Sequence, residues 1–190
     1  MGDQFIDIAL DAAYDAAQKY NPGLILITND NSTDKKSPRD EARFNLLRPK
    51  LVAARKKGMR VAMGFEGHVQ KLGRDEMSPR DLARRMALLA QDGILARVSE
   101  MDVTTHIGDT TTLEGLRVQA EQFGSIAKTC MQARNCISFT MWGVGGKYAS
   151  TAGIDDQGKL SWGSNLPWDK NLKQRPAAYH ALQDALLSAA

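Results

Sequence analysis

The sequence predicts an α/β protein in which parallel strands alternate with flanking helices. Stretches with helical periodicity and short apolar runs succeed one another along the 190 residues. The apolar runs are continuous rather than alternating, which is typical of strands covered on both faces. No G-x-G-x-x-G motif follows a strand, which argues against a dinucleotide-binding fold. Four such strands fit a small open doubly wound sheet or half of a (β/α)8 barrel, which needs ~250 residues when whole.

The element boundaries follow from local signals. Asn21-Pro22-Gly23 ends the first helix, and Gly58 ends the second. Ser37-Pro38 and Ser78-Pro79 each place an N-capping serine before a proline suited to the first helical turn. The predicted helices are 4–20, 38–57, 79–91, 112–133 and 176–187, and the predicted strands are 24–28, 60–65, 93–98 and 137–141. No linker or low-complexity segment divides the chain, so residues 1–190 are expected to form one domain or part of a larger one.

Composition excludes several classes of partner. The net charge of +3 is mild, and no Lys/Arg cluster is interleaved with aromatic residues, so no nucleic-acid partner is expected. No apolar stretch is long enough to span a membrane, so no membrane partner is expected. Met1–Gln4 lacks a basic segment followed by an apolar one, so no signal peptide is visible.

The two cysteines, Cys130 and Cys136, flank a predicted turn between a helix and a strand. A disulfide across so short a loop is feasible if the geometry permits it, and it would indicate an oxidising compartment. Two reduced thiols are the alternative. Without a nearby histidine, the pair does not make a metal site.

Polar and aromatic side chains gather where the predicted strands end. Each of them alone has an ordinary structural explanation, such as a turn, a solvated loop or a core position. Together they are more informative, because the carboxyl ends of parallel strands meet at one rim, where α/β folds carry their chemistry. They are Asn29-Asp30, Glu66-Gly67-His68, Glu100-Met101-Asp102 and Trp142-Gly143.

Two carboxylates beside an aromatic ring favour glycoside hydrolysis. One carboxylate can attack the sugar carbon while a second carboxyl group protonates the leaving oxygen. A nearby imidazole can orient the nucleophile. Metal-dependent hydrolysis is the competing interpretation, with His68, Glu66 and Asp102 as ligands, but their spacing matches no strong metal motif. We therefore expect no metal and no other cofactor.

At this point the motifs, taken together and in order, resemble glycoside hydrolase family 10, the β-1,4-xylanases. Val98–Val103 resembles the T-E-[LM]-D strand that carries the nucleophile, and Gly64–His68 resembles the G-x-Q-x-H segment that precedes it. Similar matches cover the rest of the chain: Gly2–Ile6 with G-D-D-Y-I, Leu24–Asp30 with L-Y-Y-N-D, Phe139–Val144 and Lys147-Tyr148 with the last barrel strand, and Pro167–Asp169 with Lys173–Tyr179 at the closing helix.

The resemblance implies the C-terminal half of a TIM (β/α)8 barrel, strands five to eight, as a single partial domain over 1–190. It implies a retaining endo-1,4-beta-xylanase acting on β-1,4-xylan, with Glu100 as nucleophile and His68 supporting it. Asn29, Glu66 and Trp142 correspond to sugar-binding positions of the family, and Cys130 and Cys136 correspond to a family disulfide. The resemblance also implies a secreted protein.

The sequence departs from the family pattern at positions that affect the expected activity. The acid/base segment W-D-V-x-N-E has no counterpart, and Glu66 stands where the family has glutamine. Gly146 and Ser150 replace an aspartate and a second tryptophan. Glu66 is an alternative acid/base. A non-catalytic remnant that binds sugar, or a half-barrel that completes a site with another chain, is also compatible with these departures. Unpaired sheet edges predict that such a half-barrel associates with itself.

Overall fold

The computed structural model describes residues 2–31, 33, 37–69, 76–104, 106–107, 110–111, 113–145, 153–154, 160–161, 165–169 and 171–188. Its helices are α1 (Gly2–Tyr20), α2 (Pro38–Lys56), α3 (Pro79–Gln91), α4 (Leu113–Gln132) and α5 (Pro176–Leu187). Its strands are β1 (Ile25–Asp30), β2 (Arg60–Phe65), β3 (His68–Val69), β4 (Leu95–Val103), β5 (His106–Ile107), β6 (Thr110–Thr111), β7 (Cys136–Met141), β8 (Gly153–Ile154) and β9 (Leu160–Ser161).

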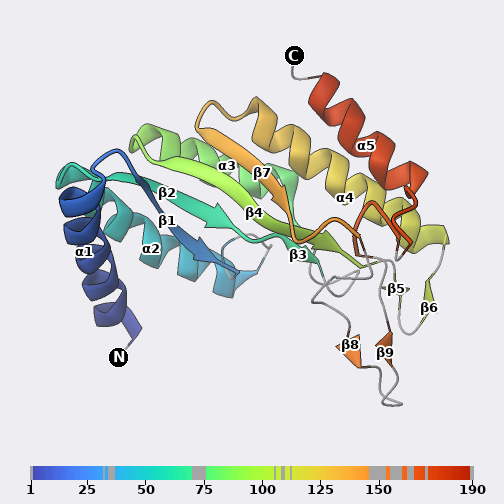
Figure 1. Cartoon of the computed structure of the whole chain (residues 1–190), viewed down its shortest axis with the longest axis horizontal. Coiled ribbons are helices and arrows are strands. Elements are labelled where there is room, and N and C mark those ends of the chain that lie inside the picture. The colour runs from blue at the N-terminus through green and yellow to red at the C-terminus, as the bar shows by residue number, and fades with distance from the viewer. Residues whose placement is uncertain are drawn as a thin grey trace.

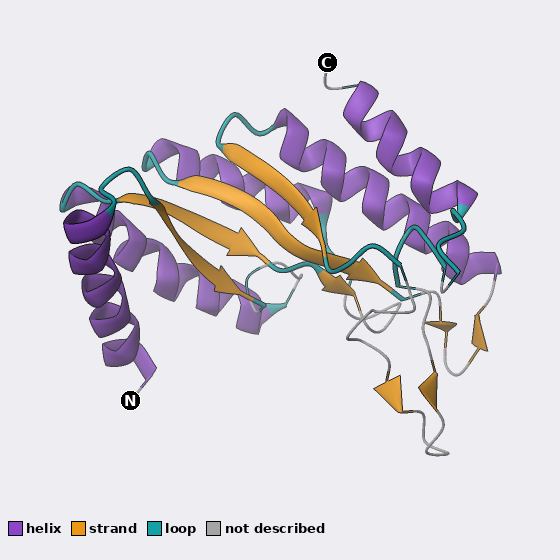
Figure 2. Cartoon of the chain, in the orientation of Figure 1, coloured by secondary structure: helices purple, strands orange, loops and turns teal. Residues whose placement is uncertain are grey.

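The architecture is a parallel sheet with helices along one face (Figures 1 and 2). β1 pairs with β2, β2 with β4, and β4 with β7, all in parallel. Helices α2, α3 and α4 contact these strands, while α1 lies next to α2 and α5 packs on α4. The α/β fold with parallel strands and flanking helices is thus as predicted, and β1 and β7 each have one ladder partner among the described strands.

The helix starts follow from the serine caps. The hydroxyl of Ser37 accepts a hydrogen bond from the amide of Asp40, and that of Ser78 accepts one from Asp81. Each hydroxyl thereby pairs an amide that has no partner inside its helix, and the proline that follows lacks such an amide altogether. Both predicted starts are confirmed.

The core lies between the sheet and the helices. It is built from side chains that project from α2, α3 and α4 onto the apolar face of β2 and β4, and most of them are fully buried. The largest include Phe44, Leu47, Leu51, Met63, Phe65, Leu82, Met86, Leu89 and Phe123. This packing fixes the strands that carry the polar residues at the carboxyl-end rim of the sheet.

One predicted strand was too short. The strand predicted over 93–98 is β4, which begins at Leu95 and continues to Val103. Its partner β2 ends opposite Val98, and β3 then pairs with Asp102 and Val103 after an interruption. The short strands β3, β5, β6, β8 and β9 were also not predicted, because pieces of two residues carry no periodicity.

A disulfide joins Cys130 at the end of α4 to Cys136 at the start of β7, with Cα atoms 5.4 Å apart. The predicted bond is therefore confirmed, and the interpretation as two reduced thiols is wrong. None of the helices in the described ranges is long and apolar enough to cross a membrane.

The disulfide makes a simple prediction. Thiol titration of the denatured, unreduced protein should detect no free thiols, and two should appear after reduction. Because a cross-link over six residues restricts the unfolded chain, reduction should lower the free energy of unfolding by about 2 kcal/mol. Two free thiols before reduction would contradict the bond, and unchanged denaturant unfolding after reduction would contradict its contribution.

Candidate active site

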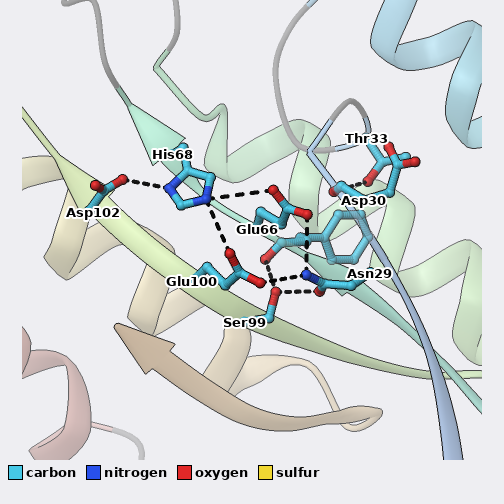
Figure 3. A network of polar contacts seen from close by, with 9 residues as sticks. Asn29, Asp30, Thr33, Glu66, His68, Ser99, Glu100 and Asp102 are labelled. Atoms are coloured by element: carbon cyan, nitrogen blue, oxygen red, sulfur yellow. Dashed lines mark hydrogen bonds and ion pairs between the residues drawn. The ribbon is translucent and has the colours of Figure 1, made fainter. Parts of the chain in front are cut away.

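The polar cluster forms where the pairing of β2 with β4 ends (Figure 3). Half-buried and buried residues alternate along Leu95–Val98, but Ser99 and Glu100 are both half-buried. The register between β4 and β7 also shifts between Val98 and Met101. Such an irregularity turns neighbouring side chains out of strict alternation, and it brings Ser99 and Glu100 to the cluster together.

Two glycines make room for the cluster. Gly64 lies opposite Asn29 in the β1–β2 ladder, and a Cβ atom there would come within 2.2 Å of the Asn29 side-chain oxygen. Gly67 has φ +82°, a conformation that side chains disfavour. It follows Glu66 in the interruption between β2 and β3, so the chain turns there and continues with His68 beside β4.

Asn29 connects the two carboxylates. Its side-chain Nδ2 donates hydrogen bonds to Oε1 of Glu100 at 2.8 Å and to Oε1 of Glu66 at 3.2 Å. Its Oδ1 accepts a hydrogen bond from the Ser99 hydroxyl at 2.5 Å. One amide therefore holds two neighbouring carboxylates in fixed positions, and Ser99 fixes the orientation of that amide.

His68 lies between three carboxylates. Its Nδ1 is 2.7 Å from Oδ1 of Asp102, a side chain that is only 1% exposed. Its Nε2 is 3.3 Å from Oε2 of Glu100 and 3.6 Å from Oε2 of Glu66. The hydrogen bond with Asp102 raises the pKa of His68, burial opposes this, and the negative charges of Asp102 and Glu66 and the hydrogen bond with Glu100 raise it further.

The raised pKa of His68 makes stability depend on pH. In the folded protein His68 keeps its proton to higher pH than in the unfolded chain, where histidine titrates at about 6.5. The stabilisation is therefore complete below that pH and is lost as pH rises through the raised pKa. Denaturant unfolding above pH 6.5 should show a decrease in stability that becomes shallower in Asp102→Asn, because the largest cause of the shift is removed. An equal slope in both proteins would contradict this assignment.

Trp142 follows β7 and lies beside the imidazole. The two ring centroids are 5.7 Å apart and nearly perpendicular, and the Trp142 amide donates to the carbonyl of Met101. The side chain is 39% exposed, so it is not part of the core of the described structure. Its exposed ring is able to contact a ligand next to the carboxylates.

The structure brings together five predicted site residues, Asn29, Glu66, His68, Glu100 and Trp142. Asp30 does not join them: its carboxylate pairs with Arg43 at 2.8 Å. Figure 3 shows Asp30 beside Thr33, whose hydroxyl donates to the Asp30 backbone carbonyl. Lys147-Tyr148, Gly146 and Ser150 lie outside the described residues.

Two further residues were not predicted. Ser99 orients Asn29. The side-chain amide of Asn165 donates to Oδ2 of Asp102 at 3.5 Å, and the backbone carbonyl of Asn165 accepts a hydrogen bond from the Val103 amide. Ser99 could have been noticed as a polar residue beside Glu100. Nothing in the sequence near Asn165 links it to a strand more than sixty residues earlier.

The fold and the cluster define a class: about half of a (β/α)8 barrel, with paired carboxylates on neighbouring strands at the rim where such folds carry their sites. The sequence model of glycosyl hydrolase family 10 matches residues 1–185. The chain therefore belongs to this family.

Known proteins resemble this chain in sequence and in fold. Endo-1,4-beta-xylanase B of Humicola insolens is 25% identical over 187 residues, which are 95% of this chain and 48% of that protein. Native xylanase 10B of Thermotoga maritima superposes with a TM-score of 0.76 at 26% identity, over 99% of this chain and 53% of the other. Xylanase 10B of Thermotoga petrophila, solved with xylobiose, has a TM-score of 0.77 at 24% identity, over 99% and 53%. The chain thus spans about half the length of the relatives it matches.

Proposed function

We propose that this chain carries the nucleophile side of the active site of a retaining endo-1,4-beta-xylanase. The observation that carries the proposal is the Glu100 carboxylate, held by Asn29 at one oxygen and facing His68 with the other. In a retaining reaction this carboxylate bonds to the anomeric carbon as the glycosidic bond breaks. Water then hydrolyses the glycosyl ester and frees Glu100.

The residues around Glu100 would each assist its attack on the anomeric carbon in a different way. Asn29 holds the carboxylate by donating to Oε1, and His68 orients Oε2 while Asp102 holds the imidazole. The exposed Trp142 ring offers an apolar face for a sugar. Glu66 would accept hydrogen bonds from sugar hydroxyls, and Asn29 would donate one to them. The xylobiose complex of the Thermotoga petrophila enzyme supports a xylo-oligosaccharide as the ligand.

The acid that protonates the leaving oxygen needs a second carboxyl group. We propose that a complementary half-barrel supplies it, because the matched xylanases are about twice as long as this chain. Glu66 is the alternative acid/base. It shares the amide of Asn29 with Glu100 and faces the same imidazole nitrogen, so both carboxylates approach a sugar from one side. A group on the nucleophile's side is poorly placed to protonate a leaving oxygen, so we assign Glu66 to sugar binding.

The leaving group of the substrate tests this division of roles. An aryl xylobioside with an acidic phenol needs little acid assistance, whereas xylan needs much. The chain alone should therefore release the phenol and leave xylan intact. Release from neither substrate, together with measurable xylobiose binding, would favour a non-catalytic sugar-binding protein. Hydrolysis of xylan that is lost in Glu66→Gln would support Glu66 as the acid.

We also propose that the isolated chain associates with itself through its open sheet edges. β1 and β7 each present an exposed isoleucine, Ile27 and Ile137. A pocket of about 380 Å³ lies beside β1, lined by apolar α1 residues such as Leu10 and by polar residues such as Asp30 and Arg43. A mainly apolar pocket of about 350 Å³ lies between β7 and α5, lined by residues such as Phe139. Neither isoleucine edge carries the lysine or proline that discourages pairing.

Light scattering tests the association. At micromolar concentration the chain should be at least a dimer, and Ile137→Lys should shift it toward monomer by placing a charge on the β7 edge. Ala87→Lys, at an exposed position on α3, is the control and should leave the mass unchanged. A monomeric wild-type protein with a cooperative melting transition would contradict the proposal.

The disulfide supports a further proposal about where the protein works. Disulfides persist in oxidising environments outside the cytosol. We therefore propose that the protein is extracellular, where a polymer such as xylan would be accessible.

A further inference from the structure

We propose that Glu66, His68 and Glu100 form a binding site for a divalent transition-metal cation of the Zn²⁺ class. The three side chains each offer one donor atom, and these atoms all lie within 4.8 Å of one another. His68 Nε2 faces Oε2 of Glu66 on one side and Oε2 of Glu100 on the other (Figure 3). The inference rests on this geometry and does not require the proposed hydrolysis.

The distances suit a small cation. Zn²⁺ binds imidazole nitrogen and carboxylate oxygen at about 2.0–2.2 Å, so neighbouring donors of a tetrahedral site lie roughly 3.3–3.6 Å apart. Two of the three donor pairs already have this separation, 3.3 Å for His68 with Glu100 and 3.6 Å for His68 with Glu66. The third pair joins the donor oxygens of Glu66 and Glu100, and a small rotation of these two carboxylates, which lie on the same rim, would bring the oxygens to this separation. A fourth position would be left for water or another ligand.

An outer layer of hydrogen bonds already orients all three ligands. Asp102 binds Nδ1 of His68 at 2.7 Å from a buried position and so directs Nε2 toward the carboxylates. Asn29 donates to Oε1 of both Glu66 and Glu100, so the Oε2 atoms are the ones that face the imidazole. Metal-binding histidines and carboxylates typically have such partners, which fix the tautomer and the ligand orientation.

The donor set also indicates the class of cation. One imidazole with two carboxylates suits Zn²⁺ and similar transition metals, whereas Ca²⁺ and Mg²⁺ prefer oxygen ligands alone. A metal site here departs from the expectation of no metal, and the competing ligand set considered from the sequence contained Asp102 in place of Glu100. In the structure Asp102 lies behind the imidazole and Glu100 in front of it. A cation bound here would occupy the oxygen of Glu100 that faces His68 and would exclude a sugar from it.

The experiment is a titration of the tag-free, metal-free chain with ZnCl2 at pH 8, followed by calorimetry, with Co²⁺ absorption as a second readout. We expect saturation at one Zn²⁺ per chain and a higher melting temperature when Zn²⁺ is bound. Glu66→Gln and Glu100→Gln should each weaken binding at least tenfold. Asp102→Asn should weaken it about tenfold or more through the orientation of His68. The exposed Glu114→Gln on α4 is the matched control and should bind as the wild type does.

The outcomes separate clearly. Absence of saturable binding would overturn the proposal, as would Zn²⁺ binding that survives both Glu66→Gln and Glu100→Gln in folded variants. Binding of Mg²⁺ as tight as that of Zn²⁺ would also overturn it, because the imidazole would then contribute nothing. Circular dichroism establishes that each variant is folded. No sugar is present, so these results are independent of whether the chain hydrolyses xylosides.

Discussion

Glu100→Gln is expected to abolish release of phenol from an activated aryl xylobioside, with a decrease of at least about a thousandfold. The amide has nearly the shape of the carboxylate, and its oxygen can still accept the hydrogen bond from Asn29. It lacks the charge and the nucleophilicity needed to attack the anomeric carbon. The loss should therefore appear in the rate and leave the melting temperature nearly unchanged.

The matched control for this substitution is Glu114→Gln. Glu114 lies at the start of α4, is exposed, and pairs with Arg117 on the same helix. Its substitution makes the same chemical change away from the cluster and should alter the rate less than about twofold, since exposed pairs contribute little. Turnover by Glu100→Gln equal to that of this control would exclude Glu100 as the nucleophile.

Phe123→Ala is expected to destabilise the chain by about 3–5 kcal/mol. Phe123 projects from α4 into the core between the helices and the sheet and is fully buried. Its removal deletes a large apolar contact and leaves a cavity that the surrounding packing can only partly fill. Denaturant unfolding should show a lower midpoint with a similar slope.

Phe5→Ala makes the same chemical change on an exposed surface. Phe5 lies on α1 and is 66% exposed, so its loss should change the free energy of unfolding by less than about 0.5 kcal/mol. Equal destabilisation by the two substitutions would mean that α4 does not pack on the sheet as described. The comparison separates the effect of burial from the effect of losing a phenyl ring.

The helices were predictable from local chemistry. Ser37 and Ser78 cap helices whose first turns contain proline, and these signals act within a few residues. The extent of β4 was not predictable in this way. Ser99 and Glu100 break the alternation, and the polar Glu100 and Asp102 are typical of a loop. Pairing with β3 and β7 keeps this segment extended, and that pairing depends on residues far away in sequence.

The candidate site was predictable to the extent that it follows from parallel strands. Asn29, Glu66 and Glu100 end consecutive strands or lie just beyond the end of the ladder, so the fold alone brings them to one rim. The individual contacts were not predictable. Asn29 can bridge both carboxylates only because Gly64 leaves space for its side chain. Asp102 lies behind His68 because the chain is interrupted at Gly67. Their roles in catalysis stay predictions.

The interruption between β2 and β3 divides the sheet into two parts that differ in local stability. Below it, β1, β2, β4 and β7 are joined by regular ladders and backed by the helical core. Above it, Glu66 and His68 are held by side-chain hydrogen bonds, by the Glu100 amide that donates to the Glu66 carbonyl, and by the two-residue strand β3. Local opening can therefore rearrange Glu66 and His68 at a small fraction of the free energy of global unfolding. Substitutions at the rim should therefore change which ligand binds there, while the ladder beneath it preserves the fold.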